Sequence, residues 1–409
     1  MWRTVVSVAL ALLALVPAAA AAERELALVG GRIHTAPGAP PIADGIILVR
    51  GSVIAAVGTR QAVPLPEGAE VLDCTGLVLS AGFWNSHVHL GNWRLLLGGR
   101  LPGAESELRE MLSRYGFVHV LDTGSPLVST TRLRERIATD VLVGPEIRTT
   151  GLGFVAPGGS PFYLKPFRLS ALATADEARA AVREQIDAGA DGIKLFTGGL
   201  ATPESVVVMD VAIVRAVTEA AHARGAFVVA HPSNSAGARA ALDGGVDILA
   251  HTFAAERDGA WDRSLTEEMR KSGMALVPTL KLWRYELERA GLPSEAVAGR
   301  IRVAQEQVRS FAAQGGQILF GTDVGYMRDF DPTEEYVFLS EAGLGFAEIL
   351  AALTTAPAER FGASSRSGRI APGLDADLVV MDGNPEQDVR PLAHVRYALR
   401  RGQLVFPSE

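Results

Sequence analysis

One stretch decides the fold of this chain, Ser80-Ala81-Gly82-Phe83-Trp84-Asn85-Ser86-His87-Val88-His89-Leu90. Its two histidines follow an apolar run, Leu77-Val78-Leu79, which we interpret as a strand. Side chains at i and i+2 of a strand point to the same face, so His87 and His89 project together. Neutral imidazole is the commonest metal ligand. The pair therefore either supplies half of a metal site or packs at a strand end with satisfied hydrogen bonds.

Apolar strands alternating with charged amphipathic stretches follow these histidines. With the run before His87 they make eight, the others being residues 118–121, 147–150, 192–196, 227–231, 247–251, 275–278 and 317–321. Helix candidates between them include residues 176–188, 206–224 and 293–314. This alternation predicts an α/β fold, a (β/α)8 barrel of the TIM type, because its central strands are apolar throughout. A doubly wound open sheet is the alternative.

Both ends of the mature chain lack helical periodicity and consist of short apolar runs separated by Gly and Pro. Such runs are typical of strands and turns. Neither end alone has enough residues for a stable core. We therefore predict one small β-sandwich built from residues 23–80 and 364–409, flanking a barrel over residues 81–363.

The first 22 residues are typical of a signal peptide. A short positive start, an apolar run and a small-residue end follow one another. The apolar run is too short to span a bilayer comfortably, although a retained N-terminal anchor is the alternative. We expect cleavage near Ala20 to Ala22 and export to the periplasm or beyond. No cysteine follows the cleavage site, so a lipid anchor there is excluded.

Composition restricts the partners. The chain is 48% apolar and 21% charged, which is ordinary for a globular protein. Its net charge is −7 and it has no basic block, so nucleic acid is not an expected partner. Cys74 is the single cysteine. This excludes an intramolecular disulfide and a metal site made of cysteines.

Six polar residues occupy the ends of the predicted strands, or lie within one. In a barrel of this type the C-terminal strand ends meet at one face and carry the chemistry. Histidines, a lysine and an aspartate there predict two closely spaced divalent ions. Each residue alone has another interpretation: a hydrogen-bonded histidine, a snorkelling lysine or a helix-capping aspartate. The six are His87, His89, Lys194, His231, His251 and Asp323.

Lys194 requires an explanation because an ammonium group repels metal ions. Carbon dioxide converts a neutral lysine to a carbamate, whose two oxygens can bridge two ions. The neighbours Ile193, Leu195 and Phe196 are apolar. Burial lowers the pKa of a lysine and favours the neutral amine that this reaction needs.

These residues carry a family resemblance. The chain resembles the amidohydrolase superfamily, and within it the imidazolonepropionase-like and prolidase-like metal-dependent hydrolases. The resemblance spans nearly the whole mature chain, and its motifs are His87-Val88-His89, Gly189-Ala190-Asp191-Gly192-Ile193-Lys194, Val229-Ala230-His231, Gly245-Val246-Asp247-Ile248-Leu249-Ala250-His251, Leu319-Phe320-Gly321-Thr322-Asp323 and Gly368-Arg369-Ile370-Ala371-Pro372-Gly373.

The resemblance implies a set of roles. His87, His89 and Asp323 would hold one ion, and His231 and His251 the other. Carbamylated Lys194 and a hydroxide would bridge the two ions, with zinc the commonest metal. Family roles make the bridging hydroxide the nucleophile and Asp323 the catalytic general base. These roles agree with the way divalent ions activate water and polarise a carbonyl.

The chain departs from the family pattern at three places. Asn85 stands where many relatives have Asp, Ser160 where relatives often have His, and Pro232-Ser233 follows His231 where related peptidases often have a small residue and then His or Tyr. The last two bear on the substrate. Candidate substrate contacts in or near the third-strand loop are Ser160, Arg148, Tyr163, Lys165 and Arg168, any of which can instead be ordinary surface or packing residues.

Our leading hypothesis is an exported metal-dependent amidohydrolase that cleaves a small-molecule amide, of the dipeptide or N-acyl amino acid type. A second enzyme hypothesis uses the same metals on a cyclic amide, lactone or carbamate, or in deamination. A catalytically silent binding protein is the alternative from another class, although none of the six ligand positions is substituted. A homo-oligomer is possible, and no stable membrane anchor is expected.

Overall fold

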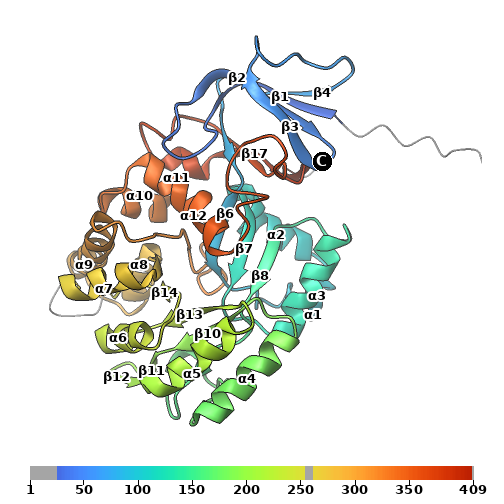
Figure 1. Cartoon of the computed structure of the whole chain (residues 1–409). Coiled ribbons are helices and arrows are strands. Elements are labelled where there is room, and N and C mark those ends of the chain that lie inside the picture. Colours follow the sequence, from blue (N-terminus) through green and yellow to red (C-terminus); the bar gives the residue numbers. More distant parts are fainter. Residues whose placement is uncertain (1–24, 254–260, 408–409) are drawn as a thin grey trace, which may run out of the picture.

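The computed structural model describes residues 25–253 and 261–407. The predicted signal peptide, residues 1–22, lies outside these residues. Figure 1 shows a β-rich unit at one end of the molecule and a larger body of strands and helices beside it. Among the described residues, no helix has both the length and the apolar character that crossing a membrane requires.

The β-rich unit combines strands from both ends of the chain. It is an eight-stranded sheet in the order β18-β17-β16-β5-β1-β2-β3, with β4 paired to β1. Antiparallel pairing of β5 with β16 joins the two ends. The hydrogen bonds define one sheet, so the joining of the termini agrees with expectation but a two-layered sandwich is not confirmed. The strands are β1(Glu25–Ile33), β2(Ile42–Arg50), β3(Val53–Thr59), β4(Glu70–Asp73), β5(Val78–Ala81), β16(Leu378–Met381), β17(Val395–Arg400) and β18(Gln403–Phe406).

The larger body contains parallel strands. One sheet has the order β6-β7-β8 and the other β15-β14-β13-β10-β9. Helices separate most of the strands along the chain, so the predicted α/β class is correct. Among the described residues no ladder of strand pairing joins these two sheets, so the pairing alone does not confirm a closed barrel. The strands are β6(Phe83–Val88), β7(Phe117–Asp122), β8(Glu146–Thr149), β9(Phe154–Val155), β10(Gly192–Phe196), β13(Phe227–His231), β14(Ile248–Ala250) and β15(Ala275–Val277).

Residues 317–324 lie between the two parallel sheets. Residues 317–321 of this segment are predicted as the eighth strand, but the segment forms only isolated parallel bridges, Leu276↔Ile318 on one side and Val88↔Val324 on the other. Its backbone still bonds both neighbours, because Leu276 N–H donates to the Gln317 carbonyl and Asp323 N–H to the His87 carbonyl. The positive φ of 60° at Asp323 interrupts a regular ladder.

The strand that carries the histidines begins later than predicted. Val78–Ala81 is β5 of the terminal sheet, and β6 starts afresh at Phe83. The apolar run before His87 therefore belongs to the other unit. Gly82 separates the two strands, and a Cβ there would lie 2.3 Å from the Val118 side chain. Only glycine fits this junction without displacing β7.

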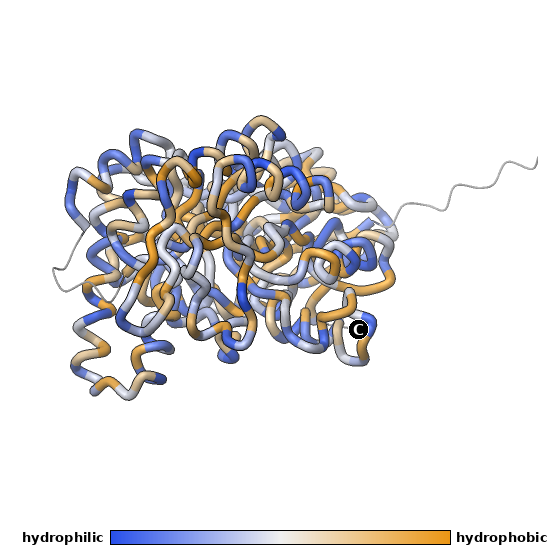
Figure 2. The backbone as a smooth tube through the Cα atoms, turned by 90° about the horizontal axis from the view of Figure 1, so that it is seen from below, coloured by the Kyte–Doolittle hydropathy of each residue, from blue (hydrophilic) through white to orange (hydrophobic). Residues whose placement is uncertain are grey.

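Amphipathic helices cover the parallel strands, and in Figure 2 the outer helices alternate between orange and blue as such helices do. The predicted helix over 206–224 starts too early. Its first residues form a hairpin, β11(Gly198–Thr202) with β12(Ser205–Val208), because three consecutive valines favour a strand. The helices are α1(Leu96–Gly99), α2(Ala104–Met111), α3(Leu127–Ala138), α4(Ala175–Asp187), α5(Val211–His222), α6(Ser235–Asp243), α7(Arg263–Ser272), α8(Leu280–Arg289), α9(Ser294–Ala313), α10(Thr333–Glu341), α11(Phe346–Leu353) and α12(Thr355–Arg360), with short 3-10 turns η1(Ser113–Tyr115), η2(Phe162–Leu164) and η3(Arg390–Ala393).

Candidate metal centre

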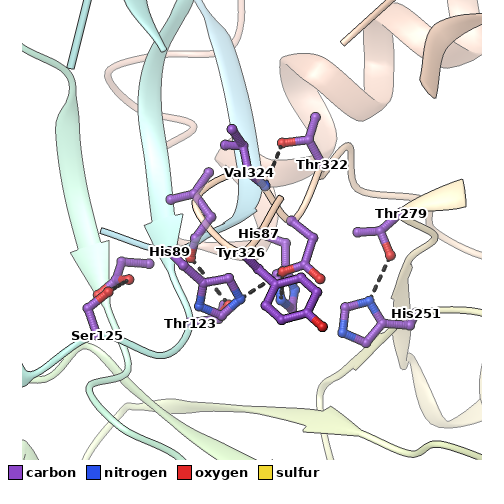
Figure 3. A network of polar contacts seen from close by, with 12 residues as sticks. His87, His89, Thr123, Ser125, His251, Thr279, Thr322, Val324 and Tyr326 are labelled. Carbon is purple, nitrogen blue, oxygen red and sulfur yellow. Dashed lines mark hydrogen bonds and ion pairs between the residues drawn. The ribbon is translucent and has the colours of Figure 1, made fainter. Parts of the chain in front are cut away.

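His87, His89 and His251 lie close together in Figure 3, and Asp323 and His231 contact members of this group. Asp323 Oδ1 is 2.7 Å from His89 Nε2 and 3.4 Å from His87 Nε2. The ring of His251 lies 4.7 Å from the ring of His87 and 4.7 Å from the ring of His231, measured between centroids. Ligand atoms of His87, His251 and Asp323 all lie within 4.8 Å of one another, which suits a shared metal ion.

The buried histidines of this cluster are neutral at ordinary pH. Burial lowers the pKa of His87 and of His251 well below the usual value, and repulsion from Lys194 adds to the shift. Burial and the same lysine lower the pKa of His231 to about 3. A neutral imidazole has a free lone pair, which is the form that binds a metal. The site thus provides ligands without first having to release their protons.

Lys194 lies inside the body on β10, with 2% of its surface exposed. Its register partner on β13 is Val229, so it faces the same side of the sheet as that buried residue. Burial lowers the pKa of its ammonium to about 7, against a smaller opposing effect of Asp323. A substantial fraction of this amine is therefore neutral near pH 7, as carbamate formation requires.

Two buried atoms of the cluster have no hydrogen-bond partner, Asp323 Oδ1 and His87 Nδ1. Buried polar atoms are normally satisfied, and each exception needs an explanation. A divalent ion near Asp323 Oδ1 is one, because nitrogen and carboxylate donors are the ligands that zinc and similar metals accept. The residues present therefore fit a metal centre.

Left-handed backbone conformations are concentrated around this cluster. Ser233, His251, Thr279 and Asp323 have φ values of 56°, 78°, 47° and 60°. Such values are unusual for residues with a side chain and cost about 1–3 kcal/mol each. Strain of this kind persists where the surrounding structure fixes a side chain in a functional position. The backbone at these strand ends adopts unfavourable φ values, and these fix the directions of the side chains.

Asn85 binds the segment that carries Asp323. Its Nδ2 donates to Thr322 Oγ1 at 2.8 Å, and its Oδ1 accepts the Thr322 N–H at 3.2 Å. The same Oδ1 accepts the His87 N–H at 3.3 Å. The amide is completely buried. Asn85 therefore ties two strand ends that supply candidate ligands, without contributing a charge.

Three of the five candidate substrate contacts, Tyr163, Ser160 and Arg148, occupy different positions. Tyr163 lies near the cluster, with its ring 5.8 Å from that of Tyr326 and its hydroxyl pKa raised by burial and then by Tyr326 and Asp323. Ser160 instead accepts the Leu169 N–H and closes its own loop. Arg148 interacts with Glu146, whose pKa it helps to lower, and among the described residues no contact joins it to the histidines.

Sequence reasoning missed three residues of the site. Thr279 Oγ1 lies 2.7 Å from His251 Nδ1, and Tyr326 crosses in front of His87 in Figure 3. Asp122 ends β7 and accepts the Leu90 N–H together with three hydroxyl groups, which fixes the loop after His89. Two of them carried a usable signal, because Thr279 closely follows a predicted strand and Asp122 immediately follows another.

The sequence matches the amidohydrolase family over residues 78–405. The chain belongs to this family. The match includes every candidate ligand from His87 to Asp323 and extends to the last strand of the terminal sheet. The clustering of neutral histidines around a carboxylate is in keeping with this amidohydrolase membership.

Known proteins similar to this amidohydrolase are hydrolases. Ochratoxinase from Aspergillus niger is 23% identical over 391 residues, covering 86% of this chain and 80% of that protein. A prolidase solved with N-methylphosphonate-L-proline is 26% identical, with a TM-score of 0.76 over 93% of this chain and 99% of that one. A Xaa-Pro dipeptidase with bound methionine is 22% identical, with a TM-score of 0.80 over 93% and 99%. The protein is a hydrolase that acts on carbon–nitrogen bonds.

Proposed function

We propose that the protein hydrolyses an amide bond of a small molecule at a centre of two divalent ions, zinc being the expected metal. His87, His89 and Asp323 would hold one ion, His231 and His251 the other, and a carbamate on Lys194 would bridge them. The observation that carries this proposal is the meeting of the neutral, buried imidazoles of His87 and His251 with the buried carboxylate of Asp323. When bound, such ions lower the pKa of water and polarise the scissile carbonyl.

Asp323 has the position of the proton-transfer residue. Its buried Oδ1 lies 2.7 Å from His89 Nε2 and 3.4 Å from His87 Nε2, and it has no hydrogen bond of good geometry among the described residues. It would take the proton of the attacking water and pass it to the leaving nitrogen. A carboxylate with this reach needs no strongly raised pKa for that role.

The substrate we propose is a dipeptide or an N-acyl amino acid with an apolar or aromatic group on the side of Tyr163. The rings of Phe162, Tyr163 and Tyr326 follow one another at centroid distances of 5.7 and 5.8 Å, and the charge of Asp323 acts on both tyrosines. Aromatic side chains bury flat apolar groups favourably. The name of one similar protein, Xaa-Pro dipeptidase, states a dipeptide substrate and supports an amide bond as the one cleaved.

Two further proposals concern the chain as a whole. We propose that the two parallel sheets and residues 317–324 form a (β/α)8 barrel whose C-terminal strand ends carry the site, which agrees with the likeness to the solved prolidase. We also propose that residues 1–22 direct export. Sequencing the N-terminus of protein recovered outside the cytoplasm tests this: a start near Glu23 is expected, and an intact Met1 contradicts it.

The function is tested with purified, metal-supplemented protein and a panel of acylated amino acids, dipeptides, cyclic amides, lactones and carbamates. We expect release of an amino acid from an amide with an apolar or aromatic group, and about two equivalents of metal per chain. Hydrolysis of a cyclic amide or ester alone would replace the proposed substrate class. A chain that binds no metal and cleaves nothing would refute the proposal.

A further inference from the structure

We propose that Thr279 is a positioning residue that holds His251 with its proton on Nδ1, so that Nε2 is free to bind a metal ion. This inference rests on the proposed function. Figure 3 shows Thr279 on the far side of the His251 ring from the other histidines, joined to it by a dashed line. The distance from Thr279 Oγ1 to His251 Nδ1 is 2.7 Å, and both residues are buried.

The direction of this hydrogen bond follows from the second bond of the hydroxyl. Thr279 Oγ1 donates its single proton to the Pro278 carbonyl at 2.9 Å. The lone pairs of Oγ1 are then left to accept a hydrogen bond from the Nδ1–H of His251. A neutral imidazole carries one N–H, so a proton on Nδ1 leaves the lone pair on Nε2. The partner of one ring nitrogen sets which nitrogen can ligate.

The Thr279 hydroxyl does not cap the helix that follows it, so it can bind His251. Thr279 occupies the N-cap position of α8, where threonine usually accepts an N–H of the first turn. Here the side chain makes no such bond. The carboxylate of Glu335, on α10, accepts the Lys281 N–H at 2.8 Å instead. Because another residue caps the helix, the Thr279 hydroxyl is available to the imidazole.

The strain at Thr279 supports the same conclusion. Its φ of 47° is unfavourable for a residue branched at Cβ. His251 also has a positive φ, and its N–H donates to the Val277 carbonyl at 2.8 Å, which fixes the ends of β14 and β15 against each other. The two strained residues thus hold hydroxyl and imidazole in contact. A role in positioning accounts for a threonine at this backbone conformation.

The test compares two substitutions with a matched control. Thr279→Val removes the hydroxyl at nearly constant volume, and Thr279→Ser keeps it. Thr252→Val removes another buried hydroxyl, one residue from His251, which accepts from Trp283 Nε1 and donates to the Pro278 carbonyl at 3.4 Å but does not contact the imidazole. Metal affinity is measured by competition between protein and a chelator for Co²⁺, with the Co²⁺ absorption spectrum recorded in parallel, and needs no substrate.

We expect Thr279→Val to weaken Co²⁺ binding about 10–100-fold and to change the spectrum, the usual effect of removing a partner of a ligating histidine. Thr279→Ser and Thr252→Val should stay within about threefold of the unchanged protein. Equal affinity in Thr279→Val and Thr279→Ser would overturn the proposal, as would an equal loss in Thr252→Val.

A second measurement tests the proposal even if Thr279→Val does not fold or the protein binds no metal. Nitrogen-15 NMR of labelled histidines in the metal-free protein reports which nitrogen of His251 carries the proton. We expect Nδ1–H, assigned by the signal that is absent from His251→Gln. An Nε2–H tautomer would overturn the proposal. Absence of metal binding with an Nδ1–H tautomer would refute the proposed function but not the positioning by Thr279.

Discussion

Replacing Asn85 by alanine should lower the free energy of unfolding strongly, because the amide of Asn85 is the acceptor of two buried backbone N–H groups. The substitution leaves the N–H groups of Thr322 and His87 without their acceptor in a fully buried environment. Each unsatisfied buried group costs about 1–3 kcal/mol. Thr322 Oγ1 still accepts the Val324 N–H at 3.3 Å, so it adds little. The expected loss of unfolding free energy is therefore about 2–6 kcal/mol.

Urea unfolding of the metal-free protein, followed by far-UV circular dichroism and by tryptophan fluorescence, measures this loss. Asn85→Asp is the control, because its carboxylate still accepts both N–H groups, and it should lose clearly less stability than Asn85→Ala. Metal binding should weaken with stability in Asn85→Ala, since the segment carrying Asp323 is released. An Asn85→Ala midpoint equal to that of the unchanged protein would refute the accounting of these hydrogen bonds.

Four further outcomes follow from the site. Asp323→Asn should lower kcat about 10²–10⁴-fold with little change in the unfolding midpoint of the metal-free protein, and full activity would exclude its role as general base. Gly325→Ala should abolish metal binding, because its Cβ would lie 1.8 Å from the His89 carbonyl oxygen; a metal titration equal to that of the original protein would contradict this. Chelation should remove activity and lower the melting temperature, and added Zn²⁺ should restore both; a chelated protein that keeps its activity would contradict the metal centre. Burial raises the pKa of Glu335 to about 7, beside Lys281 and Glu334, so the folded state binds the proton more tightly than the unfolded one. Its contribution to stability is present below about pH 4.5 and is lost as pH rises towards 7. In Glu335→Gln the urea midpoint should therefore vary less with pH over this range. An unchanged pH dependence of the midpoint would contradict the assignment.

The sequence predicted the α/β class and the meeting of four histidines with Asp323, because both depend on periodicity and on strand ends. The sequence misplaced elements where apolar runs do not coincide with the boundaries of the strands. The apolar run Val78–Ala81 and the strand from Phe83 are joined through a single glycine, so apolar character alone does not divide them. The segment 317–324 keeps the apolar pattern of a strand but is interrupted by the backbone of Asp323.

The parts of the site that escaped prediction depend on contacts between distant residues. Tyr326 belongs to the site because its ring meets Tyr163, more than 160 residues earlier. Thr279 acts on His251 only because Glu335 caps α8 in its place. Spacing along the chain gives no signal for Tyr326, and the place of Thr279 after a predicted strand does not identify His251 as its partner. Arg148 helps to lower the pKa of Glu146, and the predicted contact of this strand-end cation with substrate stays a prediction.

The pairing of β5 with β16 has a consequence for biosynthesis. On the ribosome, β5 is complete about 300 residues before β16 is made, a delay of about 15–60 s at usual elongation rates. Throughout that time β5 is an exposed strand edge, the kind of surface that recruits strands from other chains. Aggregation during synthesis should therefore depend on how fast the last 40 or so residues arrive, and a chain truncated before β16 should aggregate even though its metal ligands are all present.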